Sequence, residues 1–266
     1  MTRGSTSILP AMLCPILALL AQNAAAAVIP VFQDRSVAAS ASASVFGLND
    51  SDGDSAAAAD FTPFVATVDP LAVTAAEGQV AVAQGVGQQD STLGGSSIAA
   101  KGEASVAMSF TAGANGSASA DAASLFEFLF TVSSVSNFLL AGNVDTVAIV
   151  TGGAAIPLLL NDVTFEDVDA SVVLFQTLTN DQAFSISGLL QPGSYRISAS
   201  AQVAGDGASA AGTARTISAV SSYEFTLDVT GVPVPEPAAP ALLLLGLAGL
   251  ALTRSARAMR PQSGAR

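Results

Sequence analysis

Residues 125–132, LFEFLFTV, decide the fold class of this chain. Apolar side chains occupy every second position of the stretch, at Phe126, Phe128, Phe130 and Val132. Successive side chains of a β-strand point to opposite faces, so a period of two residues is typical of a strand. The aromatic content of the repeating face predicts a strand that lies between two layers.

Two later segments, 195–203 and 217–229, alternate apolar with polar side chains, which predicts half-buried antiparallel strands. Residues 191–193, Gln-Pro-Gly, match a type II turn and predict a hairpin from the strand at 184–186 to the strand at 195–203. The Gly-Asp-Gly sequence at 205–207 predicts the end of that strand. Together these patterns predict a mostly β fold, an antiparallel β-sandwich of jelly-roll-like type.

The predicted body spans residues 28–230, and its first part, 28–120, is rich in Ala, Ser and Gly. Such a composition is typical of a flexible stalk. Over residues 37–45, however, Val and Ala alternate with small partners, and a similar pattern returns over 104–110. Small side chains in alternation permit closely stacked sheets. We therefore favour strands of the same sandwich over a disordered stalk, with a domain division near residue 120 as the fallback.

Charge and missing residue types restrict the function. The chain has 21 Asp and Glu against 9 Lys and Arg, a net charge of −12, which repels nucleic-acid phosphates and anionic lipid headgroups. It has no His, and its single cysteine, Cys14, lies in the N-terminal apolar segment. Disulfides, Cys-His or Ser-His-Asp catalysis and the usual zinc sites are therefore excluded from the body. We expect no enzyme; a hydrolase with paired carboxylates is the enzymatic alternative.

The first 27 residues have the three parts of a secretory signal peptide. Arg3 supplies a positive charge, residues 8–21 are apolar, and small residues that include Ala26 and Ala27 follow. This order predicts export across the inner membrane by the secretion machinery and cleavage by signal peptidase after Ala26 or Ala27. A lipoprotein signal at Cys14 is disfavoured because the residues around this cysteine form a poor acylation motif.

The C-terminal segment, residues 231–266, begins with a proline-rich stretch. Pro235, Glu236 and Pro237 lie where neither a strand ladder nor a helix can continue. Residues 238–253 carry no charge and predict a helix of roughly 24 Å, slightly shorter than a hydrocarbon core of ~30 Å. We therefore expect this helix to hold the chain in the inner membrane.

An arginine cluster, Arg254, Arg257 and Arg260, follows the apolar segment. Long arginine side chains can snorkel and so make up for the short helix. The positive-inside rule keeps these stop-transfer charges in the cytoplasm, so the body is expected outside.

The order of Pro235-Glu236-Pro237, apolar helix and arginines resembles the PEP-CTERM sorting signal of Gram-negative bacteria. The resemblance covers the C-terminal tag, with a loose compositional likeness in the β-rich body. It implies recognition by an exosortase, cleavage near the motif, transfer to the cell surface or extracellular space, and association with exopolysaccharide and biofilm. It also implies that Glu236 and its flanking prolines are the recognition element. An ordinary single-pass anchor with a proline linker is the alternative and has the same topology.

One cluster of the body has ligand chemistry. Asp50, Asp52 and Asp54 lie in the glycine-containing stretch 49–54, where alternate carboxylates can surround Ca²⁺, although the spacing departs from that of an EF-hand. The alternative is a solvated acidic turn between strands, and a second acidic patch at 161–169 has the same two interpretations. A calcium- or carbohydrate-binding adhesion module is thus the alternative function. No cofactor other than Ca²⁺ is expected.

Overall fold

The computed structural model of the protein describes residues 28–111, 115–152, 157–178, 181–208 and 213–232. The predicted signal peptide, and the sorting segment from residue 233 onward, lie outside the described residues. The described strands belong to one compact unit, Ala25–Val232. Among the described residues, no helix has the length and apolarity needed to cross a membrane.

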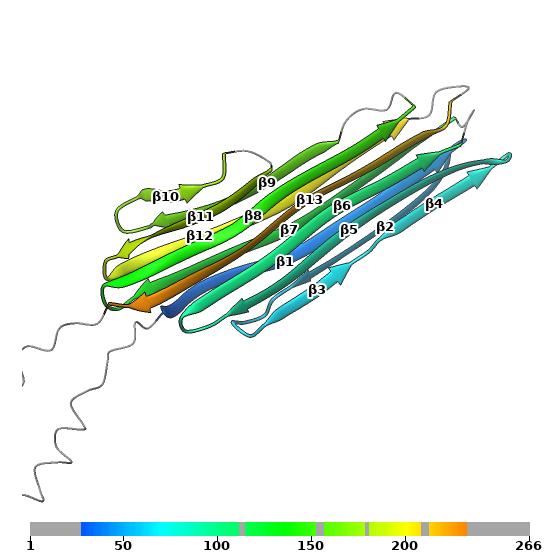
Figure 1. The fold of residues 1–266 in the computed structure, drawn as a ribbon. Coiled ribbons are helices and arrows are strands. Elements are labelled where there is room, and N and C mark those ends of the chain that lie inside the picture. Colours follow the sequence, from blue (N-terminus) through cyan, green and yellow to red (C-terminus); the bar gives the residue numbers. More distant parts are fainter. Residues whose placement is uncertain (1–27, 112–114, 153–156, 179–180, 209–212, 233–266) are drawn as a thin grey trace, which may run out of the picture. The chain divides into compact units, whose positions relative to one another are not determined.

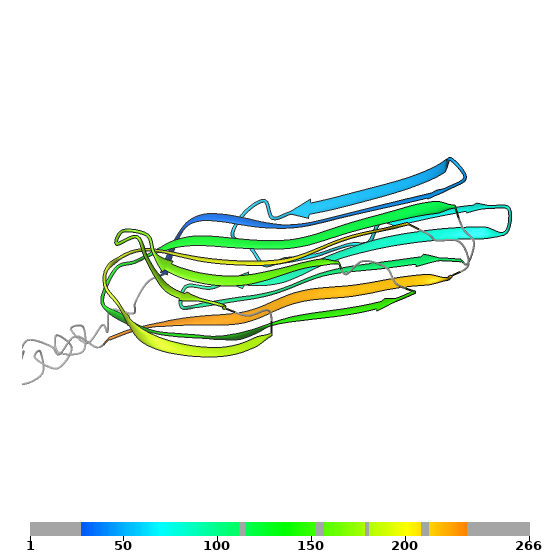
Figure 2. The ribbon, with the colours of Figure 1, turned by 90° about the horizontal axis from the view of Figure 1, so that it is seen from above.

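The described residues form two antiparallel sheets that lie face to face as two layers (Figures 1 and 2). The strands of sheet A are β1 (Val28–Val45), β2 (Leu48–Ala57), β7 (Gly116–Val132), β9 (Leu158–Asp167), β10 (Val172–Gln176) and β12 (Gly193–Ala208). The strands of sheet B are β3 (Phe64–Val68), β4 (Leu71–Ala76), β5 (Gln79–Leu93), β6 (Ser97–Phe110), β8 (Ser136–Thr151), β11 (Gln182–Leu190) and β13 (Arg215–Gly231).

Neighbours in each sheet are mostly distant in the sequence. Sheet A has the order β10-β9-β12-β7-β1-β2, and sheet B has the order β11-β8-β13-β6-β5-β3, with β4 also paired to β5. The prediction of a mostly β, antiparallel fold is therefore confirmed.

Strand β7 shows how the period of two builds the core. Its inner face is a continuous buried row: Ala118, Ala120, Ala122, Ser124, Phe126, Phe128, Phe130 and Val132. The aromatic end confirms the expectation from residues 125–132. In the same way, buried apolar residues alternate along β12 and β13, as the two later segments predict.

The Ala- and Ser-rich first half forms strands. β1 pairs with β2 through residues 36–57 and with β7 through residues 28–45, so it lies inside sheet A. β7 runs through residue 120 and pairs with β12 on its other side. Segments from both halves of the sequence therefore share one sheet.

Small residues bring the two sheets close together where strands of the first half of the sequence pack against each other. A Cβ atom on Gly85 of β5 would lie only 2.7 Å from the carbonyl oxygen of Asp121 in β7 and 2.9 Å from that of Ser40 in β1. Only glycine lets the backbones of the two sheets approach this closely. The expectation of closely stacked sheets is confirmed at this position.

The predicted hairpin at residues 191–193 is wrong. The link connects β11 in sheet B to β12 in sheet A, and these strands do not pair with each other, because β11 pairs with β8 and β12 pairs with β7 and β9. Gly193 also lacks the positive φ of a type II turn. Instead, the hydroxyl of Tyr195 donates a hydrogen bond to the carbonyl of Gln191 at 2.8 Å and holds the crossing.

The predicted end of the strand at residues 205–207 lies one residue before the observed end, because β12 ends at Ala208. A Cβ atom would lie 2.6 Å from Met108 Cε at Gly205 and 3.1 Å from the Phe110 ring at Gly207. The two glycines therefore make room for large core side chains of β6 rather than forming a turn.

A polar layer separates the small-residue part of the core from the aromatic part. The buried Tyr223 hydroxyl accepts a hydrogen bond from Gln89 Nε2 at 2.8 Å and lies 3.3 Å from Ser124 Oγ. Burial raises the pKa of Tyr223 to about 12, because a phenolate would lose its hydration. Ser124 occupies the position between Ala122 and Phe126 on β7, so the layer marks the change in packing.

Candidate functional site

The acidic stretch at residues 49–54 lies within strand β2, so the prediction of a solvated turn between strands is wrong there. In the register with β1, Asp50 is opposite Ala43, Asp52 opposite Ala41 and Asp54 opposite Ala39. Opposite residues of an antiparallel pair point to the same face. Since the three alanines face the core, the aspartates point inward at the edge of sheet A.

Two of these carboxylates bind the edge of sheet B. Asp50 Oδ2 accepts a hydrogen bond from the Val73 N–H at 2.8 Å, and Asp52 Oδ2 accepts one from the Leu71 N–H at 3.3 Å. Alternate N–H groups of an edge strand have no strand partner, so β4 presents these donors two residues apart. The aspartate spacing matches that period. The carboxylates therefore connect the two sheets along their shared edge.

Asp54 lacks such a partner in β4, and its Oδ1 accepts a hydrogen bond from the N–H of Ser55 at 2.7 Å. Among the described residues, no group of three or more Asp, Glu, His or Cys side chains is arranged to hold a metal ion. The three aspartates that the sequence brings together thus divide into two that bind β4 and one that binds its own neighbour.

The second acidic patch is bound into sheet A by hydrogen bonds. Arg196 of β12 donates to Glu166 of β9 at 2.6 Å and to Glu127 of β7 at 3.3 Å, and the hydrogen bond that it donates to Glu166 is the main cause of the raised pKa of Arg196. Asp162 accepts from the Thr164 and Thr177 hydroxyls. These groups connect neighbouring strands and turns.

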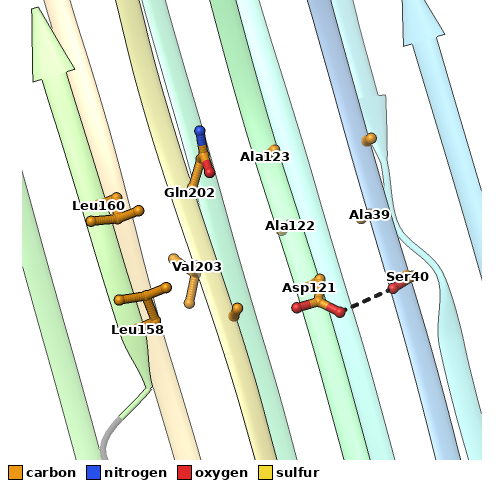
Figure 3. Close-up of a pocket in the computed structure, with 11 residues that line it drawn as sticks. Ala39, Ser40, Asp121, Ala122, Ala123, Leu158, Leu160, Gln202 and Val203 are labelled. Atoms are coloured by element: carbon orange, nitrogen blue, oxygen red, sulfur yellow. Dashed lines mark hydrogen bonds between the residues drawn. The ribbon is translucent and has the colours of Figure 1, made fainter.

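An open groove crosses the outer face of sheet A (Figure 3). It has a volume of about 290 Å³ and lies over β1, β7, β12 and β9. Leu158 and Leu160 of β9 form one side, and Gln202, Asp121 and Ser40 add an amide, a carboxylate and a hydroxyl (Figure 3). Ser40 Oγ lies 3.5 Å from Asp121 Oδ2. Sequence analysis missed this groove, because its polar members are far apart in the chain.

The side chains that line the groove are suited to binding a ligand rather than to catalysis. Asp121 is the one titratable side chain among the lining residues, so the groove lacks the facing carboxylates of a glycoside hydrolase. An apolar floor with a few hydrogen-bonding groups fits a neutral, hydroxylated chain. A polyanion would be repelled by the net charge of −12.

Sequence analysis also missed Arg35, which is fully buried in β1. Its guanidinium donates to the Thr62 carbonyl at 2.9 Å, to Ser91 Oγ at 3.2 Å, and to the Asp60 carbonyl. Burial lowers the pKa of Arg35, and the charge of Asp60 partly opposes this shift. The residue holds the segment between β2 and β3 against the core, so its role is structural.

The remaining predicted site residues lie outside the described residues. They are the cleavage residues Ala26 and Ala27, the motif Pro235, Glu236 and Pro237, and the stop-transfer residues Arg254, Arg257 and Arg260. Comparison of the chain with protein-family models, with curated proteins and with solved structures gave no match.

Proposed function

We propose that this chain is an exported, exosortase-processed protein of the cell surface or extracellular matrix, with a structural role linked to exopolysaccharide and biofilm. The observation that carries the proposal is the order of Pro235-Glu236-Pro237, uncharged apolar segment and arginine cluster. A body without cysteine suits an oxidising compartment, because it cannot form wrong disulfides.

The proposed processing assigns a role to each part of the tag. Glu236 with its prolines is the recognition element, residues 238–253 are a transient anchor, and Arg254, Arg257 and Arg260 stop translocation. The jelly-roll-like classification of the body also stays a prediction. None of the three roles requires chemistry from the body.

The intact mass of the protein from the surface of an exosortase-bearing Gram-negative host tests this proposal. We expect a C-terminus near residues 235–237 in that host and an uncleaved tail in the same host without the enzyme. Glu236→Ala should block processing and leave export intact, whereas the matched variant Glu224→Ala, in the exposed face of β13, should mature normally. Retention of the arginine tail in both hosts would identify a plain single-pass membrane protein.

The groove over sheet A supports a second candidate function, a carbohydrate-binding adhesion module. Asp121 and Gln202 provide an acceptor and an amide at its rim. Asp121→Ala with Gln202→Ala should weaken co-sedimentation with a neutral polysaccharide, and Gln84→Ala on sheet B should not. Equal retention of all variants would remove this candidate.

Calcium binding by Asp50, Asp52 and Asp54 stays a prediction. A ligand that binds only the folded state raises the melting temperature. A rise with millimolar Ca²⁺ that Asp54→Ala abolishes would support the adhesion module, and no change would remove calcium from it.

A further inference from the structure

Sheet B has a step at one edge, where β11 stops before the end of β8. β11 pairs with β8 only from Ser136 to Val144. On its other side, β8 pairs with β13 as far as Thr151. Among the described residues, no strand pairs with the outward side of residues 145–151. We call this stretch the β8 notch.

The notch presents backbone groups that no described strand binds, and their direction is known. The N–H of Thr146 points to the open side, because it donates a hydrogen bond to Asp181 Oδ1 at 2.9 Å. Backbone N–H and C=O groups of alternate residues point to the same side of a strand. Ala148 and Val150 therefore present their N–H and C=O groups to the open side, two donors and two acceptors in a row.

The side chains of the notch favour strand pairing. Residues 146–151, Thr-Val-Ala-Ile-Val-Thr, contain no charge, proline or glycine, and β-branched residues dominate. Val147 is 50% exposed and Ile149 is 62% exposed on the outer face of the sheet. An exposed, uncharged edge strand of this composition is a template for another strand.

Other edges of the molecule carry features that oppose pairing. The edge formed by β2 and β4 has inward-pointing aspartates, and Asp50 and Asp52 already bind the outward N–H groups of Val73 and Leu71 in β4. β10 has a bulge between Val173 and Phe175. Charges and bulges are the usual protection of edge strands against pairing. Asp145 and the Asp181 carboxylate lie at the start of the notch, but residues 147–151 carry neither a charge nor a bulge, so this part of β8 differs from these edges.

We propose that the β8 notch binds the β8 notch of a second copy of this chain, as an antiparallel pair about a twofold axis at Ile149. Ala148 then exchanges both backbone hydrogen bonds with Val150 of the second copy, and each Ile149 faces its counterpart. Val147 faces Thr151 of the second copy. The two sheets B thus join into one sheet across the dimer.

The backbone geometry selects this register. Pairing about Ala148 would need the Thr146 N–H, which Asp181 already binds. Pairing about Ile149 needs only Ala148 and Val150. Gly152, with a φ of 69°, turns the chain at the end of the paired stretch. The contact is isologous, so it closes a dimer and does not extend into a fibre.

The interface is small, so we expect weak association. Edge pairing of a few residues buries less than the roughly 1,200 Å² at the lower end of stable interfaces, and we expect a Kd of about 10 µM or weaker. Each copy has a net charge of −12, so screening of this repulsion should make the dimer tighter as salt increases.

Cysteine cross-linking of the full chain tests the register. With Cys14→Ser in both proteins, Ile149→Cys should give a disulfide-linked dimer on oxidation, because directly opposite residues have Cβ atoms about 4.5–5.5 Å apart. Val147→Cys, which faces Thr151 of the second copy, should cross-link at least about tenfold less. Equal or greater cross-linking of Val147→Cys would overturn the proposed pairing.

Sedimentation equilibrium of the full chain tests the contact without cross-linking. Ile149→Lys puts two like charges opposite each other and should raise the Kd at least about tenfold. Leu189→Lys on β11, at a position that is 60% exposed, should leave the Kd unchanged. Circular dichroism confirms that both variants fold. A wild-type chain that stays monomeric at about 500 µM, or equal effects of the two variants, would overturn the proposal.

Discussion

The two sheets pack against each other in opposite ways in the two halves of the core. Near Phe126, Phe128 and Phe130, large rings fill the space between the layers. Near Gly85 and Ala120, the layers approach until the backbones nearly touch. The same strand, β7, therefore runs along a narrow half of the core, where the sheets lie close together, and a wide half, where rings separate them. Its inner side chains change from alanine to phenylalanine along its length.

Removal of an aromatic ring should have the largest effect. The ring of Phe130 lies 5.5 Å from Phe128, 6.5 Å from Phe165 and 6.0 Å from Tyr195, measured between centroids. We expect Phe130→Ala to lower the free energy of unfolding by about 3–5 kcal/mol, because the wide half cannot close over the cavity. Denaturant unfolding measures this loss. Leu125→Ala, at an exposed position of β7, is the control and should cost less than about 1 kcal/mol.

In the narrow half of the core, added volume rather than lost volume should destabilise the protein. Gly85→Ala puts a Cβ atom within 3 Å of two carbonyl oxygens, so we expect a loss of about 2–3 kcal/mol in the free energy of unfolding. Gly95→Ala is the matched control, because no atom lies within 4 Å of its Cβ position. A Gly85→Ala variant as stable as the wild type would mean that the sheets separate there at little cost.

The contribution of the polar layer between the two halves to the free energy of unfolding should depend on pH. The pKa of Tyr223 is raised to about 12 in the folded protein, above the usual value of 10.0. The folded state thus favours the protonated phenol, and its contribution is full below pH 10 and is lost as pH rises through 12. We expect a loss of about 2 kcal/mol by pH 12.

Unfolding experiments between pH 9 and pH 12 on the wild type and on Tyr223→Phe measure this contribution. The pKa of Tyr195 is also raised, chiefly by burial. Both proteins retain Tyr195, so only the difference between them reports on Tyr223. Parallel pH profiles would contradict the assignment.

The smallest loss of stability is expected at the edge where β2 and β4 meet. Asp50→Ala and Asp52→Ala should each cost about 1 kcal/mol, because the β4 N–H groups lose charged acceptors that are exposed to solvent. Amide hydrogen exchange should accelerate at Val73 and Leu71, respectively. Asp54→Ala should leave both amides unchanged. Acceleration in all three variants would indicate general loosening of β2 instead.

Local patterns were sufficient for much of the fold. The alternation at 125–132, 195–203 and 217–229 predicted strands because the direction of a side chain in a strand depends only on its position. The prediction of a hairpin at residues 191–193 was wrong for the opposite reason. A Pro-Gly pair ends one strand and begins another, but the sheet that each strand joins depends on partners far along the chain.

In the candidate sites too, local patterns point to single residues, but the contacts of those residues depend on distant segments. Asp50 and Asp52 are conspicuous in the sequence, yet their role depends on N–H groups of β4 about twenty residues later. The groove joins Ser40, Asp121 and Gln202, which no local pattern connects. Arg35 carries no signal besides its place in a strand of alternating burial.

By itself, the sequence determined the strand periodicity, the acidic, cysteine-free composition of the body and the predicted export and sorting signals, because these properties reside in adjacent residues. Only the tertiary structure decided which strands pair, how closely the sheets approach, which aspartates bind β4 and where β8 has no described strand beside it. Those features arise from contacts between segments that are distant in the chain, and the free energy of such contacts depends on both partners.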